Sequence, residues 1–525
     1  MPERASRVRF AAWAALAGVV SAGVFLAVAE VAALVLARES SPILAVGSFV
    51  IDVVPQPLKE FAIAAFGEYD KPVLLGGLGL AVVLAAAIAG VLQLWRPPFG
   101  IVLLGIAGVL SIAAIVTRAG ATPLAWLPPV LGAIAGSIVL AASVGRLRRW
   151  AGVAAEGARD TPADGPASPP PDRRAFLQLI TIAGAAALLA GVGARAANMA
   201  TTSVAAVRRA LRLPEPRSRV TVPAGAELDV PGISPLYTPN ADFYRVDTAL
   251  TVPAIDPSTW RLTVDGLVDQ KVELTFDDLV EMGLDEYSIT LTCVSNEVGG
   301  ELVGTARWLG VPVRDVLALA GPRGDADMVL SRSIDGFTAS TPLEALTDPG
   351  RDAILAVAMN GEPLPQEHGF PVRMVVPGLY GYVSATKWLT ALTVTTFAAD
   401  EAYWTPRGYS ARAPIKFSSR MDTPRTGQPV PAGTVALAGV AWAQTVGIER
   451  VEVRIDDGDW QAATLSEPVN DDTWVQWMLE WDAAPGTHNV TVRAVNRDGD
   501  LQVEERAPIA PDGSTGWQRT LVRVT

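Results

Sequence analysis

Thiol and imidazole side chains are nearly absent from this chain of 525 residues, which has one cysteine, Cys293, and two histidines, His368 and His488. A single thiol excludes a disulfide within the chain. It also leaves too few ligands for an iron–sulfur cluster, and there is no C-x-x-C-H segment to attach a c-type haem. Both histidines lie in the second half, so we expect no histidine-ligated haem in the first half.

Positive charge is also scarce. The chain has 42 Lys and Arg against 54 Asp and Glu, a net charge of 42 − 54 = −12. Residues 1–200 contain 15 basic and 11 acidic side chains, net +4, so residues 201–525 contain 27 and 43, net −16. Because binding to nucleic acid requires clustered Lys and Arg, the acidic second half argues against a nucleic-acid partner.

Long apolar runs are abundant in the first 200 residues. A helix needs about 20 such residues to cross roughly 30 Å of hydrocarbon. Five stretches qualify, near residues 10–37, 72–94, 99–117, 124–145 and 175–194. We therefore expect an N-terminal all-α transmembrane bundle, with about four spans in residues 1–150 and a fifth in residues 173–195. Residues 42–66 are apolar but interrupted by Pro and charged residues, which predicts an interfacial or re-entrant helix on the outer side.

The distribution of basic residues predicts the orientation of these spans. With the N-terminus in the cytoplasm, ten basic side chains of this region fall on the inner side and five on the outer side. The positive-inside rule favours this arrangement. Five spans then place the chain after about residue 195 outside the cytoplasm, in a multi-pass protein of the plasma membrane.

Residues 151–172 are rich in Ala, Pro, Asp and Gly toward their end and predict a cytoplasmic linker, because such a segment cannot form a core. Arg173 and Arg174 follow, and then an Ala-, Leu- and Gly-rich run. This arrangement is similar to a twin-arginine export signal, which is used by proteins that fold around a cofactor before crossing the membrane. The alternative is an ordinary arginine pair that flanks a span.

The second half shows short strands, turns and a few helices from about residue 220. Residues 252–264 predict an extended segment that enters a strand. Thr275 predicts the N-cap of a short helix with Asp277 and Asp278 in its first turn. Residues 287–293 predict a strand that carries the lone thiol at its end. A thiolate there suits a soft, redox-active metal, although a free cysteine is more often a small buried hydrophobic residue.

Several motifs follow one another in this half of the chain. They are Asn240–Asp247, Thr292–Asn296, Thr305–Pro312, Met359–Pro365, His368–Arg373, Val376–Gly381 and Lys387-Trp388. Together they closely resemble the sulfite-oxidase family of molybdopterin enzymes over roughly residues 230–420. The resemblance implies an α+β sulfite-oxidase-type molybdopterin domain, which we assign to residues 220–420.

The resemblance also implies a molybdenum–molybdopterin cofactor with Cys293 as the protein thiolate on the metal. It implies cofactor contacts from Asn240, Phe243, Tyr244, Arg245, His368, Arg373, Ser384, Thr386 and Lys387. The chemistry of several of these residues agrees. Arg373 and Lys387 can hold a pterin phosphate, and His368 can donate a hydrogen bond to it. A purely structural role for His368 is the alternative, and His488 is expected to be structural.

The family places a tyrosine beside the oxo group, and residues 403–409 resemble that segment. This implies that Tyr409 hydrogen-bonds the substrate oxygen and relays a proton, unless its ring only packs in a loop. Arg245 is expected to add positive charge beside the substrate. We therefore take Cys293, Tyr409 and Arg245 as the catalytic residues.

The chain departs from sulfite oxidases after the thiolate, where they have basic residues and this chain has Asn296, Glu297 and Val298. A dianion requires a cationic pocket, so this departure puts sulfite in doubt as the substrate. Arg245, Arg307 and Arg407 could compensate only if they face the metal. Position in the sequence does not determine which way they face.

The last hundred residues predict strands with alternating apolar positions at residues 451–455, 474–481 and 488–494, and a hairpin turn at residues 456–459. These features are typical of a β-sandwich. The family resemblance further implies a C-terminal all-β immunoglobulin-like dimerisation domain at residues 421–525, and hence a homodimer.

We therefore expect a membrane-anchored, exported molybdopterin oxidoreductase that transfers an oxygen atom to or from a small oxoanion or sulfoxide. Because the chain lacks ligands for haem or iron–sulfur clusters, its electrons are expected to pass through a separate cytochrome, cupredoxin or quinone-linked partner. One alternative is a sulfoxide reductase that uses the same centre. The other is a non-catalytic membrane receptor that retains the cofactor fold.

Overall fold

The computed structural model describes residues 2–36, 46, 70–116, 124–157, 171–200, 204–249 and 252–525. The chain divides into two compact units, one containing the helices up to α7 and the other containing the elements from α8 onward. The expected interfacial helix at residues 42–66 lies almost entirely outside the described residues. Of the expected linker at residues 151–172, both ends are helical, and residues 158–170 lie outside the described part.

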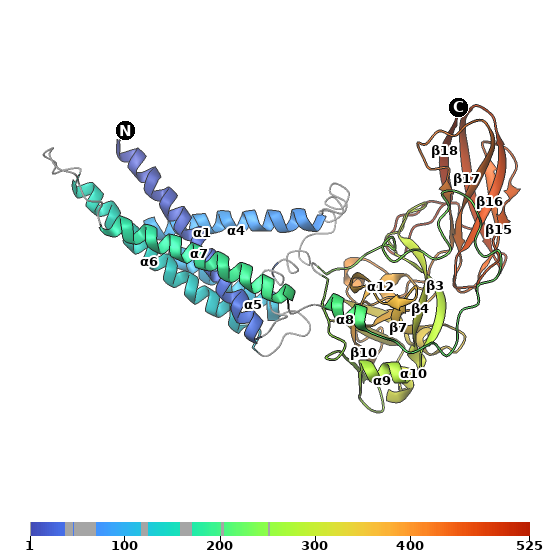
Figure 1. Cartoon of the computed structure of the whole chain (residues 1–525), viewed down its shortest axis with the longest axis horizontal. Helices are drawn as coiled ribbons and strands as arrows, with labels where there is room; N and C mark the ends of the chain where they lie inside the picture. Colours follow the sequence, from blue (N-terminus) through green and yellow to red (C-terminus); the bar gives the residue numbers. More distant parts are fainter. Residues whose placement is uncertain are drawn as a thin grey trace. The chain divides into compact units, whose positions relative to one another are not determined.

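The first unit consists of long apolar helices (Figure 1). They are α1 (Pro2–Leu36), α4 (Asp70–Trp95), α5 (Phe99–Val116), α6 (Leu127–Gly157) and α7 (Pro171–Ala200). Five helices in the described part of the chain are long and apolar enough to cross a membrane. The expected number of candidate spans is therefore confirmed.

Close packing and an apolar surface characterise this unit. Helix α1 packs against α4, α6 and α7. A Cβ atom at Gly18 would collide with the carbonyl of Ala86, and one at Gly90 would collide with that of Ala14, so only glycine permits this approach of α1 to α4. Large apolar side chains are exposed on the outside, with Leu189 at 73%. Such an apolar surface is unfavourable in water and is compatible with the hydrocarbon of a membrane.

Two sheets form the first part of the second unit. One has the order β2-β1-β10-β5-β6 and the other the order β3-β4-β7-β8, with β9 also paired to β7. The strands of the first sheet are β1 (Arg261–Gly266), β2 (Val272–Thr275), β5 (Met328–Ser333), β6 (Thr338–Pro342) and β10 (Leu389–Thr395). Those of the second are β3 (Asp285–Thr292), β4 (Val303–Pro312), β7 (Ile354–Met359), β8 (Glu362–Pro363) and β9 (Arg373–Val375). Strands β1 and β10 pair in parallel, and the other pairs are antiparallel.

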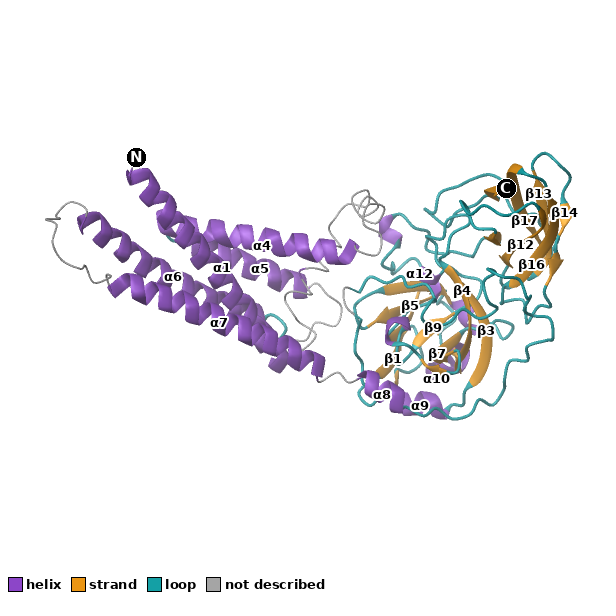
Figure 2. Ribbon diagram, turned by 45° about the horizontal axis from the view of Figure 1, so that its top comes forward, coloured by secondary structure: helices purple, strands orange, loops and turns teal. Residues whose placement is uncertain are grey.

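Short helices lie before, between and after these strands along the chain, which gives this part a mixed α and β composition (Figure 2). They are α8 (Val204–Ala210), α9 (Phe276–Glu281), α10 (Val313–Ala320), α11 (Leu343–Thr347), η2 (Gln366–His368), α12 (Gly381–Ser384) and η3 (Thr405–Arg407). The predicted cap of α9 is confirmed. Thr275 accepts from the backbone N–H of Asp278, and the Asp278 carboxylate accepts from that of Thr275.

The hydrophobic core of the second sheet lies directly against the segment that carries the first predicted site residues. Ile289 of β3 and Trp308 of β4 are completely buried, and the Trp308 indole donates to the Ile289 carbonyl over 3.1 Å. Phe243 packs into the same core. This core therefore anchors one wall of the site.

Two four-stranded sheets form the C-terminal part. Their strands are β11 (Ser418–Thr423), β12 (Gly433–Trp442), β16 (Val475–Ala483) and β15 (Thr464–Leu465) in one, and β14 (Gln461–Ala462), β13 (Ile448–Ile455), β17 (Gly486–Asn496) and β18 (Gln518–Val524) in the other. Side chains from both sheets share one core, which includes Leu437, Trp477, Val451 and Val492. The predicted alternation and the turn after β13 are confirmed, and the part is an all-β sandwich.

The sandwich contacts the loop that follows the thiol. Ser514 donates to the carbonyl of Asn296 over 2.7 Å, and Arg420 donates to the carbonyl of Gly300 over 2.9 Å. Trp474 donates to the carbonyl of Leu236 over 2.9 Å. The C-terminal part therefore helps to hold the loop in place.

Candidate active site

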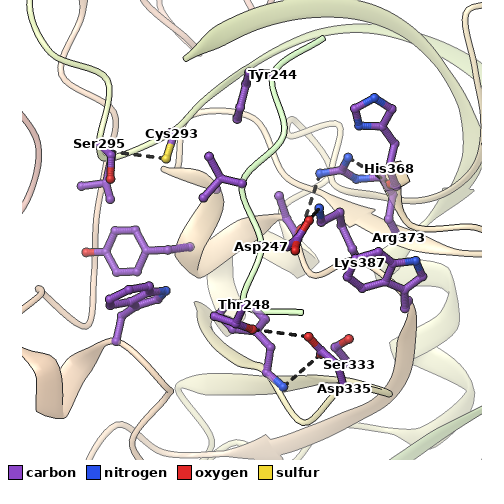
Figure 3. A pocket seen from close by; sticks show the side chains of 18 of the residues that line it. Tyr244, Asp247, Thr248, Cys293, Ser295, Ser333, Asp335, His368, Arg373 and Lys387 are labelled. Atoms are coloured by element: carbon purple, nitrogen blue, oxygen red, sulfur yellow. Dashed lines mark hydrogen bonds and ion pairs between the residues drawn. The ribbon is translucent and has the colours of Figure 1, made fainter. Parts of the chain in front are cut away.

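One pocket collects side chains from several separate elements of the second unit (Figure 3). Its empty volume is about 920 Å³ including the open mouth, which is large enough for a cofactor-sized molecule. The predicted site residues in its lining are Phe243, Tyr244, Cys293, His368, Arg373, Lys387 and Tyr409. Side chains far apart in the sequence thus form a single site.

The thiol of Cys293 lies at the end of β3, in a loop held by backbone hydrogen bonds. The N–H of Cys293 donates to the Leu302 carbonyl over 2.9 Å, and the Asn296 side chain accepts from the Leu302 N–H over 2.9 Å. The Ser295 N–H lies 3.4 Å from the sulfur and donates to it. Burial raises the pKa of the thiol, so a thiolate here needs a compensating positive charge such as a metal ion.

Arg373, at the start of β9, is a buried cation without a carboxylate partner. The side chain is only 5% exposed, its Nε has no hydrogen-bond partner, and its other nitrogens donate only to the carbonyls of His368 and Ala385. Burial lowers the pKa of the guanidinium to about 10. A buried charge is costly unless paired, so the structure calls for an anion at this point.

Lys387 lies near Arg373 and is paired with Asp247 (Figure 3). The Nζ of Lys387 donates to Oδ2 of Asp247 over 2.8 Å and to the carbonyl of Glu367 over 3.0 Å. The same carboxylate oxygen accepts from Nε of Arg245 over 2.8 Å. Burial lowers the pKa of Lys387 to about 8, while Asp247 acts in the opposite direction.

His368 is neutral and oriented by a backbone carbonyl. Its Nε2 lies 3.0 Å from the carbonyl oxygen of Asn240, so Nε2 carries the proton and donates. Burial lowers the pKa of this histidine to about 4, helped by the charge of Arg373. A neutral imidazole has one N–H, so Nδ1 can only accept from a ligand. The expected donation from His368 to a phosphate is therefore not available in this arrangement.

Aromatic rings form another wall of the pocket. Tyr409 packs edge to face between Tyr382 and Trp404, with ring centroids 5.6 Å and 5.3 Å apart. Gly408 has a left-handed φ of 94° that turns the chain after η3, and the N–H of Tyr409 donates to the Trp404 carbonyl over 3.3 Å. This turn places the Tyr409 ring in the pocket.

Four of the predicted site residues do not line the pocket. The Asn240 side chain donates to Glu362 over 2.6 Å, and only its backbone carbonyl meets His368. Ser384 donates to the carbonyls of Leu379 and Tyr380, and Thr386 pairs with Ser331. The Arg245 side chain is 40% exposed and bound to Asp247. Their roles toward a cofactor remain predictions.

The structure adds side chains to the site that were not among the predicted site residues. Val246, Asp247 and Thr248 line it, as do Ser333 and Asp335. Thr248 donates to Asp335 over 3.3 Å, and the hydroxyl of Ser333 is buried without a partner. Residues 333–337 show only the signal of a hairpin turn, which gives no indication of a pocket.

Comparison with known proteins shows which enzymes this chain is similar to. Residues 249–404 match the family model of the oxidoreductase molybdopterin binding domain. The chain is 33% identical to human mitochondrial sulfite oxidase over 341 residues, which is 55% of this chain and 62% of the human protein. It is 29% identical to the NADH nitrate reductase of Solanum lycopersicum, over 48% of this chain and 35% of that protein.

A further relative shows the family. The chain is 30% identical to the sulfite oxidase of Gallus gallus, over 54% of this chain and 72% of that protein. This chain belongs to the sulfite oxidase family of molybdopterin-binding oxidoreductases. Its match spans about three fifths of the length of human sulfite oxidase. Among solved structures, the sulfane dehydrogenase SoxCD of Paracoccus pantotrophus matches with a TM-score of 0.49 at 23% identity, over 55% of this chain and 81% of that one.

The residues of the pocket fit a molybdenum–pterin cofactor. The buried guanidinium of Arg373, which has no carboxylate partner among the described residues, suits a phosphate, with the Lys387 ammonium close by. The Cys293 sulfur, which has one backbone donor, suits a metal. In Figure 3, Cys293 and Ser295 lie on one side of the pocket, and Arg373 and Lys387 lie on the other. A ligand with a metal at one end and an anion at the other could therefore contact the thiol with its metal and the two cations with its anion.

Proposed function

We propose that the protein is a membrane-anchored, exported enzyme that transfers an oxygen atom to or from a small sulfur compound with the exchange of two electrons. A buried guanidinium without a carboxylate partner, in the same pocket as the only thiol of the chain, is the observation that carries the proposal. Family membership supports it. When bound, the cofactor supplies the two-electron oxygen-atom transfer.

The side chains of the pocket have separate tasks in this proposal. Arg373 and Lys387 hold the phosphate of the pterin, and the Cys293 thiolate ligates the metal. Asp247 fixes Lys387 through its 2.8 Å contact. The phenol of Tyr409 orients the substrate oxygen and carries a proton to or from it. Asn240, Phe243, Tyr244, His368, Ser384 and Thr386 support the cofactor directly or through the backbone.

The helices of the first unit serve as the anchor. Their number and apolarity support five spans, and the basic residues favour a cytoplasmic N-terminus with the catalytic part outside the plasma membrane. The arginine pair before α7 would act as an export signal of the twin-arginine type, because a cofactor protein has to fold before it crosses. We assign residues 220–420 to the catalytic domain and residues 421–525 to an immunoglobulin-like domain that forms a homodimer.

Electrons would leave or enter through another protein. The one cysteine and two histidines of the chain are too few to ligate a chain of metal centres. We therefore propose a separate one-electron carrier, such as a cytochrome, a cupredoxin or a quinone-linked protein.

Metal and pterin analysis of the full-length wild-type protein and of Cys293→Ala tests the proposal. The wild type is expected to contain molybdenum and pterin in equal amounts. The variant is expected to keep the pterin but lose turnover with redox dyes, because the phosphate contacts are independent of the thiol. A folded wild type without molybdenum, made in molybdenum-replete cells, would refute the enzyme and leave the receptor alternative. Unchanged turnover in Cys293→Ala would exclude Cys293 as the ligand.

A further inference from the structure

The formal charges of the side chains that line the pocket add up to zero. Arg373 and Lys387 contribute two positive charges and Asp247 and Asp335 two negative ones, so the formal sum is 2 − 2 = 0. Both cations are already assigned to other groups. Lys387 is bound to Asp247, and Arg373 is in the position that suits the phosphate. A second anion in the pocket would therefore find no free positive charge in its lining.

The three arginines that could have supplied this charge do not reach the lining. Arg245 binds Asp247, Arg307 lies 5.4 Å over the ring of Tyr237 and 3.8 Å from a Glu286 oxygen, and Arg407 lies 3.7 Å over the ring of Tyr403. Glu297, which the sequence suggested would repel an anion, is exposed and also absent from the lining. The missing positive charge, and not Glu297, is therefore the feature that disfavours a dianion.

Apolar and aromatic side chains make up much of the rest of the pocket lining. Val246, next to Arg245 in the chain, lines the pocket and is 47% exposed. Val294 and Phe337 also line it, together with the edge-to-face series Tyr382, Tyr409 and Trp404. A surface of this kind binds an uncharged group through apolar contact and cannot replace the hydration of a dianion.

We infer that the pocket takes an uncharged organosulfur compound, a sulfoxide or the corresponding thioether, in preference to sulfite, and that Val246 and the Trp404–Tyr409 wall determine this choice. The inference rests on the proposed oxygen-atom transfer and specifies its substrate class. In the reducing direction, one sulfoxide, two protons and two electrons give one thioether and one water. The sulfur–oxygen bond breaks, sulfur keeps the electron pair, and the oxygen leaves as water.

The reverse reaction balances in the same way. Water supplies the oxygen, and the thioether sulfur gives up two electrons. In both directions a one-electron carrier protein, or a redox dye in its place, donates or accepts the electrons one at a time. Tyr409 is the group of the aromatic wall that can move a proton to or from the oxygen.

Binding measured without turnover tests the inference. Full-length protein loaded with cofactor is titrated calorimetrically with a dialkyl sulfone, which is neutral and does not react, and with sulfate, which is a dianion. The sulfone is expected to bind at least about tenfold more tightly than sulfate, and its dissociation constant is expected not to change with ionic strength. Tighter binding of sulfate would overturn the inference.

Val246→Arg adds the missing charge at an exposed position. Sulfate is expected to bind this variant at least about tenfold more tightly than the wild type, with a lower KM for sulfite. The matched control is Val503→Arg, which adds the same charge at a position 52% exposed in the C-terminal part and is expected to change neither value. Equal gains in both variants, or no gain in Val246→Arg, would contradict the role of Val246.

Turnover separates this inference from the proposed function. Dye-driven reduction of sulfoxides is expected to exceed dye-coupled oxidation of sulfite by at least about a hundredfold in kcat/KM. If molybdenum and pterin are present and sulfite is the better substrate, the substrate class is wrong and the oxygen-atom transfer stands. If the protein contains no molybdenum, the inferred substrate class and the proposed oxygen-atom transfer are both wrong.

Discussion

The ammonium of Lys387 lies 2.8 Å from the carboxylate of Asp247, and both side chains are nearly buried, at 10% and 3% exposure. Burial, Arg373 and Arg245 lower the pKa of Lys387, and among the described residues the attraction of this carboxylate acts against them. Asp247 therefore determines whether Lys387 is charged near neutral pH.

Asp247→Asn is expected to lower the pKa of Lys387 below about 8 in protein without cofactor, because burial then acts without a counter-charge. The labelling of Lys387 by an amine reagent, followed by mass spectrometry across pH, measures this change. Its midpoint should move to lower pH. The control is Asp512→Asn beside Lys416, a pair of the same 2.8 Å length with exposures of 45% and 32%. Because Asp512 is outside the pocket lining, this variant should leave the labelling midpoint of Lys387 unchanged.

Arg373→Met is expected to separate stability from cofactor binding. Without cofactor the variant should be more stable than the wild type by about 1 to 3 kcal/mol, because a buried charge without a carboxylate partner among the described residues is removed. In cells that make the cofactor, its pterin content should fall at least about tenfold. Denaturant unfolding and pterin fluorescence after acid release measure the two effects. Arg412→Met, at a side chain 60% exposed, should change neither. Full pterin content in Arg373→Met would exclude the phosphate contact.

Tyr409→Phe is expected to lower kcat by about 10 to 100 times while KM changes by less than about twofold, because only the hydroxyl is removed. The pterin content should stay at the wild-type level. Steady-state kinetics with redox dyes gives both constants. Tyr287→Phe, on β3 and outside the pocket lining, serves as the control. A kcat at the wild-type level would leave Tyr409 with a packing role only.

Asp472→Asn is expected to change how the stability of the second unit depends on pH. Burial raises the pKa of Asp472 to about 7, with Asp352 and Asp471 acting in the same direction and Arg351 against it. Between about pH 4 and pH 7 the unfolded chain is ionised here while the folded protein keeps the proton. The folded state therefore binds more protons, and its stability falls as pH rises through this range.

The amide of Asp472→Asn does not ionise, so the variant should lack this fall. Its Tm should exceed that of the wild type by about 2–8 °C at mildly alkaline pH, and the difference should shrink toward pH 4. Calorimetry of the full-length protein in detergent measures both. An increase of the same size at every pH would mean that the substitution acts through a changed contact and not through the ionisation of Asp472.

Much of the fold could be predicted because its signals are local. The five helices that are apolar enough to cross a membrane follow from continuous apolar runs, the helix after Thr275 from its N-cap residue and the acidic residues of its first turn, and the strands of the sandwich from alternation. The pairing of β1 with β10 involves residues more than a hundred positions apart, and no local pattern specifies it. The same limit applies to the charges of the pocket, which come from separate loops.

The sequence by itself determined the five long apolar helices, the family resemblance and the choice of Cys293, Arg373 and Lys387 as candidate site residues, because apolar length and motif order are properties of the chain. Only the tertiary structure decided that Val246 lines the pocket while Arg245 binds Asp247 and stays outside the lining. These residues lie in an irregular segment, where side-chain direction has no fixed period and follows from long-range contacts. One of these contacts, between Asp247 and Lys387, spans 140 positions of the chain.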